Sequence, residues 1–254
     1  MPGQHYRQNY LTQVILRVDY DALPALQSQE PTELSNRVKA RFPIVTGTPV
    51  AKIVVNFSPA GSGVQQQLVG KQWEHRKEAG GTKALFFTPD HLSLEYGRGD
   101  YDHFPPFRAE FDEAFNALVQ LYPDVRITRI GLRYINQIRL EQGNPLDWET
   151  YLAAGLVTSV KAGISNGATL VKSMHQLHVR RDNLNLLFHY GISNPEYPAA
   201  VSRREFVLDL DCHKMEVVPP NEVTTTITAL NEMCESTFEA SILPAFRALM
   251  EPIQ

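Results

Sequence analysis

The residues with the clearest chemical potential in this sequence are the arginines of one alternating segment, residues 126–141. Arg129, Arg133 and Gln137 recur there at multiples of two, and Arg139 keeps the same parity. Successive side chains of a strand point to opposite faces, so these four are expected on one surface, opposite an apolar face. A guanidinium group suits phosphate and carboxylate, so the row predicts a surface that contacts an anionic ligand or partner.

A second alternating segment, residues 204–212, carries acids that bear on this prediction. Glu205, Asp209 and Asp211 share one face, and the opposite face is apolar. If both strands bury their apolar faces in one sheet, the acids and the arginines stand on the same side. Three interpretations then stay open. The first is cross-strand ion pairing, at about 0.2–1 kcal/mol per pair. The others are an arginine-floored groove for an anion or a nucleic-acid backbone, and a protein interface.

The same carboxylates define an alternative from another class of function. Asp209 and Asp211, with Glu205, offer the oxygen ligands that Mg²⁺ or Mn²⁺ prefers, as in a metal-dependent nuclease or phosphotransfer enzyme. Two aspartates at this spacing are a weak pattern. The sequence also lacks the common motifs of nucleotide-binding enzymes, serine hydrolases and zinc proteases. We therefore expect a non-catalytic accessory or binding protein without a cofactor, and keep the metal enzyme as the alternative.

Basic side chains interleaved with aromatic ones indicate a second kind of partner, a nucleic acid. Two predicted strands carry them: Lys71, Trp73 and His75 on one, Lys172 and Arg180 on the other. Bases stack on exposed aromatic side chains while phosphates contact basic ones. Ordinary solvated hairpins have the same composition. A protein partner or complex is therefore the leading expectation, and nucleic acid and a homodimer stay open.

Composition limits the class of protein. The chain has 254 residues, of which 43% are hydrophobic and 20% charged, enough for a real core and one large domain or two joined halves. A formal net charge of -4 argues against coating nucleic acid through overall charge. Only two cysteines, no signal-like start and no long apolar run predict a cytoplasmic protein without a membrane span.

Hydrophobic periodicity predicts an α+β fold in two halves, residues 1–122 and 123–254, forming one integrated globular unit. Each half reads strand, helix, several antiparallel strands, helix. The two sheets are expected to be joined or facing, with helices packed on one side. Strands are expected at 11–20, 51–58, 64–77, 82–88, 91–97, 126–141, 168–181, 183–191 and 204–212. Helices are expected at 30–43, 105–121, 146–155 and 221–250, the last bent at Pro244, and mobile loops at 155–167 and 192–203.

The segment Gly131–Asn136, GLRYIN, also carries a family resemblance. With LTQVILRVDY, YDHFPPFRAEF and FVLDLD in the same order, it resembles a sporadically distributed family of uncharacterised prokaryotic proteins. The resemblance implies a bacterial or archaeal cytoplasmic protein. Its patchy distribution is similar to that of accessory genes such as phage-defence or toxin–antitoxin components. The family often has tryptophan where Phe104 stands, and it supplies no catalytic residues.

Overall fold

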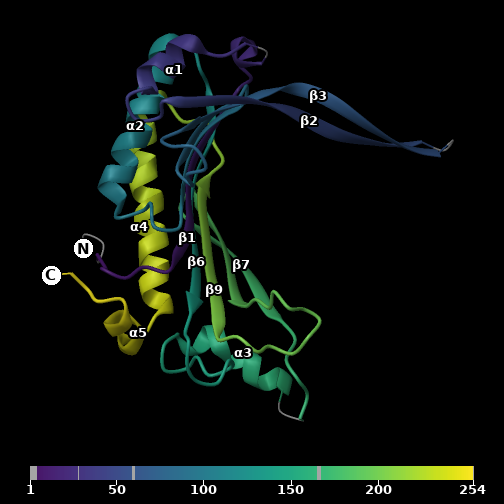
Figure 1. The fold of residues 1–254 in the computed structure, drawn as a ribbon, viewed down its shortest axis with the longest axis vertical. Coiled ribbons are helices and arrows are strands. Elements are labelled where there is room, and N and C mark those ends of the chain that lie inside the picture. Colours follow the sequence, from purple (N-terminus) through teal and green to yellow (C-terminus); the bar gives the residue numbers. More distant parts are fainter. Residues whose placement is uncertain (1–4, 28, 59–60, 165–166, 254) are drawn as a thin grey trace.

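One antiparallel sheet organises the chain (Figure 1). The computed structural model describes residues 5–27, 29–58, 61–164 and 167–253, with the backbone alone for 52–58, 61–69 and 161–163. The strands of this described part are β1 (Leu11–Tyr20), β2 (Ile44–Ser58), β3 (Gly61–Arg76), β4 (Ala84–Phe87), β5 (His91–Gly97), β6 (Ile127–Arg139), β7 (Ser173–Arg181), β8 (Leu184–Ile192) and β9 (Glu205–Lys214). The helices are α1 (Thr32–Val38), α2 (Phe104–Leu121), α3 (Ala154–Ile164), α4 (Val223–Ser241) and α5 (Pro244–Leu249).

The strand order joins the two predicted halves at the centre of the sheet. It runs β2-β3-β4-β5-β1-β6-β9-β8-β7. The first strand of each half, β1 and β6, pair antiparallel, with Leu16 opposite Leu132. The last strand of each half, β5 or β9, lies directly outside them. The predicted α+β class is confirmed, and the two predicted sheets are joined into one.

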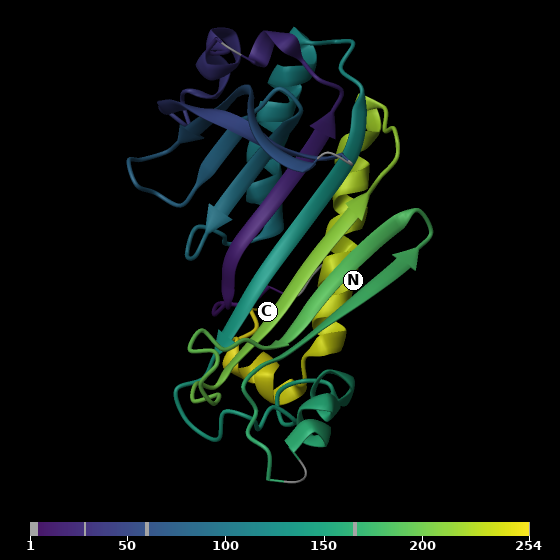
Figure 2. The same ribbon diagram turned by 90° about the vertical axis from the view of Figure 1, so that its right-hand side faces the viewer.

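The helices cover one face of this sheet and leave the other uncovered. Alternation buries every second side chain of β1, including Val14, Leu16 and Val18, which are fully buried. Apolar stripes of α2 and α4, represented by Phe111 and Leu230, complete the core. Figure 2 looks onto the uncovered face, with α4 behind the strands.

Two projections border the uncovered face. The β2–β3 hairpin extends away from the sheet on the side opposite α2 and α4, and α3 lies near the other end of the strands (Figure 1). No helix in the described ranges combines the length and apolar composition that crossing a bilayer requires.

The structure corrects the helix predicted at 146–155 and the loop predicted at 155–167. Residues 145–146 and 149–151 are turns, Leu152 forms an isolated bridge, and α3 begins only at Ala154. The Asn144 side chain accepts a bond from the Leu146 amide, which starts a turn. The Ala153 amide donates to the Ser241 carbonyl at the end of α4, and Leu152 bridges Ile242, so residues 152–153 pair with another segment and are not helical.

Other boundaries differ as well: the helix predicted at 30–43 spans only Thr32–Val38, and the strand predicted at 168–181 begins at Ser173. β2 begins at Ile44 rather than 51, because Pro49 is tolerated in an edge strand, where its missing N–H costs no ladder bond. The helix predicted at 221–250 is two helices, with Ile242 and Leu243 extended between them and Pro244 starting α5.

Candidate functional site

The predicted arginines of β6 lie on the uncovered face, and carboxylates meet them there. Arg133 donates two bonds to Asp209, from Nε to Oδ1 at 2.8 Å and from Nη2 to Oδ2 at 2.7 Å. These bonds raise the pKa of Arg133. Arg129 lies 3.6 Å from a carboxylate oxygen of both Asp19 and Asp211. The centre of the row is therefore a ladder of ion pairs.

The lower part of the row is paired as well. The Glu205 side chain is fully buried, accepting a bond from Gln137 Nε2 at 3.1 Å and from Arg139 Nε at 2.6 Å. Guanidinium groups thus occupy the oxygens of Glu205 and Asp209 and lie near those of Asp211. Within the described ranges these three acids form no group with metal-ligand spacing. The geometry does not favour the alternative of a metal-dependent enzyme built on them.

The remaining predicted basic residues lie elsewhere. Arg180, on the edge strand β7, is separated from β6 by β8 and β9 and donates from Nε to the Asp182 carbonyl. Lys172 is exposed just before β7. Trp73 and His75 are only 7% and 0% exposed, so neither ring is available to stack on a base. Both are on the face of β3 that packs on the core, because residues two apart in a strand point to the same side.

A hollow of about 340 Å³ lies at the end of β6 and was missed by sequence reasoning. Arg139, Arg203 and Arg204 line it together with a single carboxylate, Glu141. Arg139 is bonded to Glu205 and Arg203 to Glu196, the latter from Nη2 at 2.7 Å. The one feature of the sequence that could have indicated this hollow is the pair Arg203–Arg204, directly before β9.

Arg204 differs from its neighbours because no carboxylate in the described part of the chain balances its charge. It donates to the backbone carbonyls of Gln142 and Asp147 and lies over the rings of Trp148 and Tyr151, 5.5 and 5.2 Å from the centroids. Its buried Nε finds no acceptor among the described residues. A Cβ at Gly143 would lie 2.5 Å from Nη1, so only glycine admits the arginine there.

A second cavity, of about 400 Å³, lies on the helix-covered face. A hydrogen-bonded chain lines it: Tyr101 and Tyr134 share a hydroxyl contact at 3.2 Å, Tyr134 donates to Asn231 Oδ1 at 2.7 Å, and Asn231 Nδ2 donates to Glu235 Oε1 at 2.9 Å. Burial raises the pKa of Glu235 and, far more, that of Tyr134. The cavity is thus mostly apolar with a few convergent polar groups, which is the usual composition of a small-ligand site.

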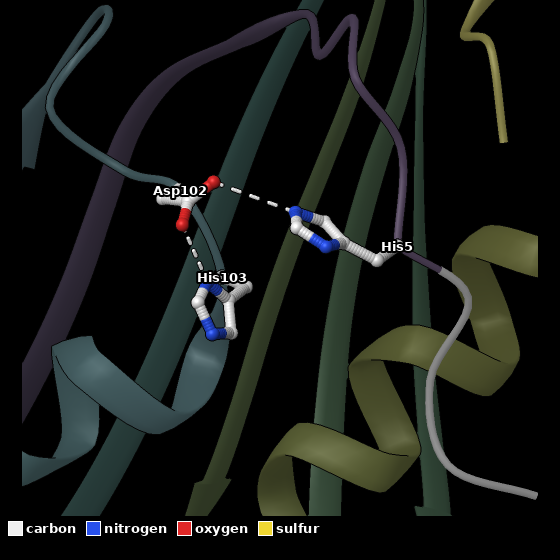
Figure 3. A group of neighbouring side chains, drawn as sticks. All are labelled: His5, Asp102 and His103. Atoms are coloured by element: carbon white, nitrogen blue, oxygen red, sulfur yellow. Dashed lines mark hydrogen bonds and ion pairs between the residues drawn. The ribbon is translucent and has the colours of Figure 1, made fainter. Parts of the chain in front are cut away.

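His5, Asp102 and His103 border this cavity (Figure 3). In the described ranges they are the one group of three possible metal ligands whose donor atoms all lie within 4.8 Å of one another. Sequence analysis singled out none of these three residues. No local spacing connects His5 to the other two, because the fold alone brings them together.

Comparison with protein-family models, curated proteins and solved structures found no match for this chain. The resemblance carried by Gly131–Asn136 therefore stays a prediction.

Proposed function

We propose that this protein is a non-catalytic binding protein whose uncovered sheet face receives a protein partner. An acidic group of that partner enters the hollow formed by Arg139, Arg203 and Arg204. The observation that carries the proposal is the Arg204 guanidinium, whose charge meets, among the described residues, only carbonyl groups and aromatic rings. Since a partly buried charge is costly without a counter-ion, an arriving carboxylate gains a strong interaction there.

The charge of the surrounding face favours a protein over a nucleic acid. Four arginines and four carboxylates alternate on β1, β6 and β9: Arg17, Arg129, Arg133 and Arg139 against Asp19, Glu205, Asp209 and Asp211. A nucleic-acid backbone binds where positive charge is in excess, and these eight side chains carry equal numbers of each sign. Mixed charges suit a protein surface that presents both signs.

The test uses a fluorescein-labelled peptide with a central pair of aspartates flanked by glycine and serine. We expect saturable anisotropy with Kd on the order of 0.1–1 mM, and no binding of the asparagine counterpart. Arg203→Gln removes one guanidinium group from the hollow and should weaken binding of the peptide about 5-fold or more. Arg37→Gln, an exposed arginine bonded to Gln120 on the helix layer, is the matched control and should change nothing.

Charge reversal of Arg129 and Arg133 is unsuitable here. It would set two new carboxylates against Asp19, Asp209 and Asp211, so a loss of binding would reflect destabilisation. A labelled single-stranded oligonucleotide separates the partner classes. Salt-sensitive binding of that probe, lost in Arg203→Gln, would replace the protein partner by nucleic acid, and no saturable binding of the peptide would reject the proposal.

A further inference from the structure

The group at the mouth of the helix-side cavity has the donor set of a metal site. Two imidazole rings and one carboxylate converge in Figure 3, from the N-terminal segment and from the turn before α2. Nitrogen and oxygen donors of this kind bind zinc and neighbouring first-row metals. Three protein ligands leave a fourth coordination position open, as in sites where zinc also binds water or a ligand.

The distances are compatible with tetrahedral coordination. Ligand atoms that lie about 2.1 Å from a tetrahedral zinc ion lie roughly 3.4 Å from one another. Asp102 Oδ1 is 3.4 Å from His5 Nε2. Asp102 Oδ2 is 2.6 Å from His103 Nδ1, a hydrogen bond that lengthens by less than about 1 Å if a metal replaces its proton. The two rings are 5.0 Å apart between centroids.

The backbone of the fold fixes both arms of the group. His103 is the extended N-cap residue of α2, whose first turn contains proline. His5 is held from the opposite end of the chain, because the Ile253 amide donates to its carbonyl at 2.9 Å. The adjacent Tyr6 donates from its hydroxyl to Glu239 Oε1 at 2.6 Å. Ligands held in this way need little rearrangement on binding.

The charge of the cavity also suits a cation. Four carboxylates line it and no lysine or arginine does, the acids being Asp102, Glu232, Glu235 and Glu239, of which Glu239 is paired with Arg247 from outside the lining. The N-terminus of α2 carries a partial positive charge that opposes a cation, and the Asp102 carboxylate beside it offsets that effect. A mostly apolar cavity lined by carboxylates raises the local concentration of divalent cations.

We infer that His5, Asp102 and His103 bind one zinc ion, with the fourth position turned to the 400 Å³ cavity. That position accepts water or an oxygen donor of a small molecule that fills the cavity. The site lies on the helix-covered face, shares no lining residue with the arginine hollow, and is independent of the function proposed above.

The test is isothermal titration of metal-free, tag-free chain with ZnCl₂. We expect one site with a Kd at or below about 10 μM, and a visible d–d band of four-coordinate Co²⁺ when cobalt is used instead. His5→Ala and His103→Ala should each weaken binding at least about 10-fold, and Asp102→Asn should abolish the cobalt band. His178→Ala, an exposed histidine on β7, is the matched control and should bind as the parent does.

A second measurement separates binding from folding. Zinc should raise the thermal unfolding midpoint of the parent and of His178→Ala, but not that of the His5→Ala, His103→Ala double variant, whose circular dichroism should match the parent. The inference is overturned if Kd is in the millimolar range. It is equally overturned if the double variant binds zinc as tightly as the parent, which would assign the ion to other side chains.

Discussion

Arg133 and Asp209 form the best-defined ion pair of the uncovered face, and they mark how far sequence reasoning reaches. Alternation on two strands places arginines and acids on one side, as predicted. The sheet register puts Arg133 opposite Asp211, yet its guanidinium reaches diagonally to Asp209. Side-chain length and rotamer decide that choice, and no sequence period records them.

The two partners should differ in the cost of their removal. The Asp209 side chain is 10% exposed and that of Arg133 39%. Arg133→Met leaves a buried carboxylate whose one remaining ion-pair partner in the described ranges is His189, at 3.7 Å, and should lower the free energy of unfolding by about 2–3 kcal/mol. Asp209→Asn leaves an arginine that water can solvate, and should lower the free energy of unfolding by only about 1 kcal/mol. Urea denaturation measures both, and equal costs would contradict the assigned asymmetry.

His75 gives the protein a pH-dependent stability. Its ring is fully buried, with Nε2 2.9 Å from Ser35 Oγ, and burial lowers its pKa. Between the lowered pKa and the unfolded value of about 6.5, the unfolded chain binds more protons. The stabilisation is therefore complete above about pH 6.5 and is lost as pH falls below it.

His75→Gln tests this linkage through the free energy of unfolding at several pH values. One titrating group changes stability by at most about 1.4 kcal/mol per pH unit. The free energy of unfolding of the variant should fall less steeply than that of the parent between about pH 7 and 5. Part of the fall should remain, because burial also lowers the pKa of His91. An unchanged slope would show that His75 is not the group responsible.

At the scale of elements, helices and strands were predicted well where a single hydrophobic period ran through a long segment. The apolar stripe of α2 and the alternation of β6 fixed both elements to within a few residues. Prediction failed around Trp148 and Leu152, whose spacing of four fits a helix. Their burial instead comes from tertiary contact, since Leu152 forms a bridge with Ile242 beyond α4.

The base of the β2–β3 hairpin depends on one glycine. Gly47 pairs with Trp73 across the strands, and a Cβ at Gly47 would lie 2.5 Å from Cζ3 of the indole. The ring cannot swing aside freely, because its Nε1 donates to the Leu26 carbonyl at 3.1 Å. Gly47→Ala should therefore destabilise the protein by about 1–3 kcal/mol.

Gly155→Ala provides the contrast for that measurement. Gly155 lies in α3 with nothing within 4 Å of an added Cβ, so alanine should raise stability by up to about 1 kcal/mol through helix propensity. Chemical denaturation followed by circular dichroism compares the two variants. A neutral Gly47→Ala would mean that the indole is free to move and that this contact does not anchor the hairpin.

At the scale of the whole molecule, the sequence predicted the repeated order of elements but left open whether two sheets join or face each other. The pairing of β1 with β6 decides this, and it links residues more than a hundred positions apart. The candidate metal group has the same origin. His5 reaches Asp102 and His103 only because the folded chain returns both of its ends to the helix-covered side (Figure 1). Contacts of this range leave no local pattern, so neither could be predicted.

The meeting of the chain ends therefore makes a prediction for the zinc site. The Arg7 amide donates to the Glu251 carbonyl at 3.0 Å, and the Ile253 amide to the His5 carbonyl at 2.9 Å. A chain ending at Met250 loses both bonds, so His5 is no longer held against Asp102 and zinc affinity should fall about 10-fold or more. Residues 251–253 are exposed, so the free energy of unfolding should change by less than about 1 kcal/mol.

Ile253→Ala keeps the backbone donor and serves as the matched control, with zinc affinity expected to equal that of the parent. Calorimetric titration of the three chains distinguishes two causes. If the shortened chain binds zinc as tightly as the parent, the C-terminal segment does not position His5. If Ile253→Ala weakens binding as much as the truncation does, the side chain and not the backbone bond holds the ligand. In the first case the bridge between Tyr6 and Pro252 would be a feature of folding alone.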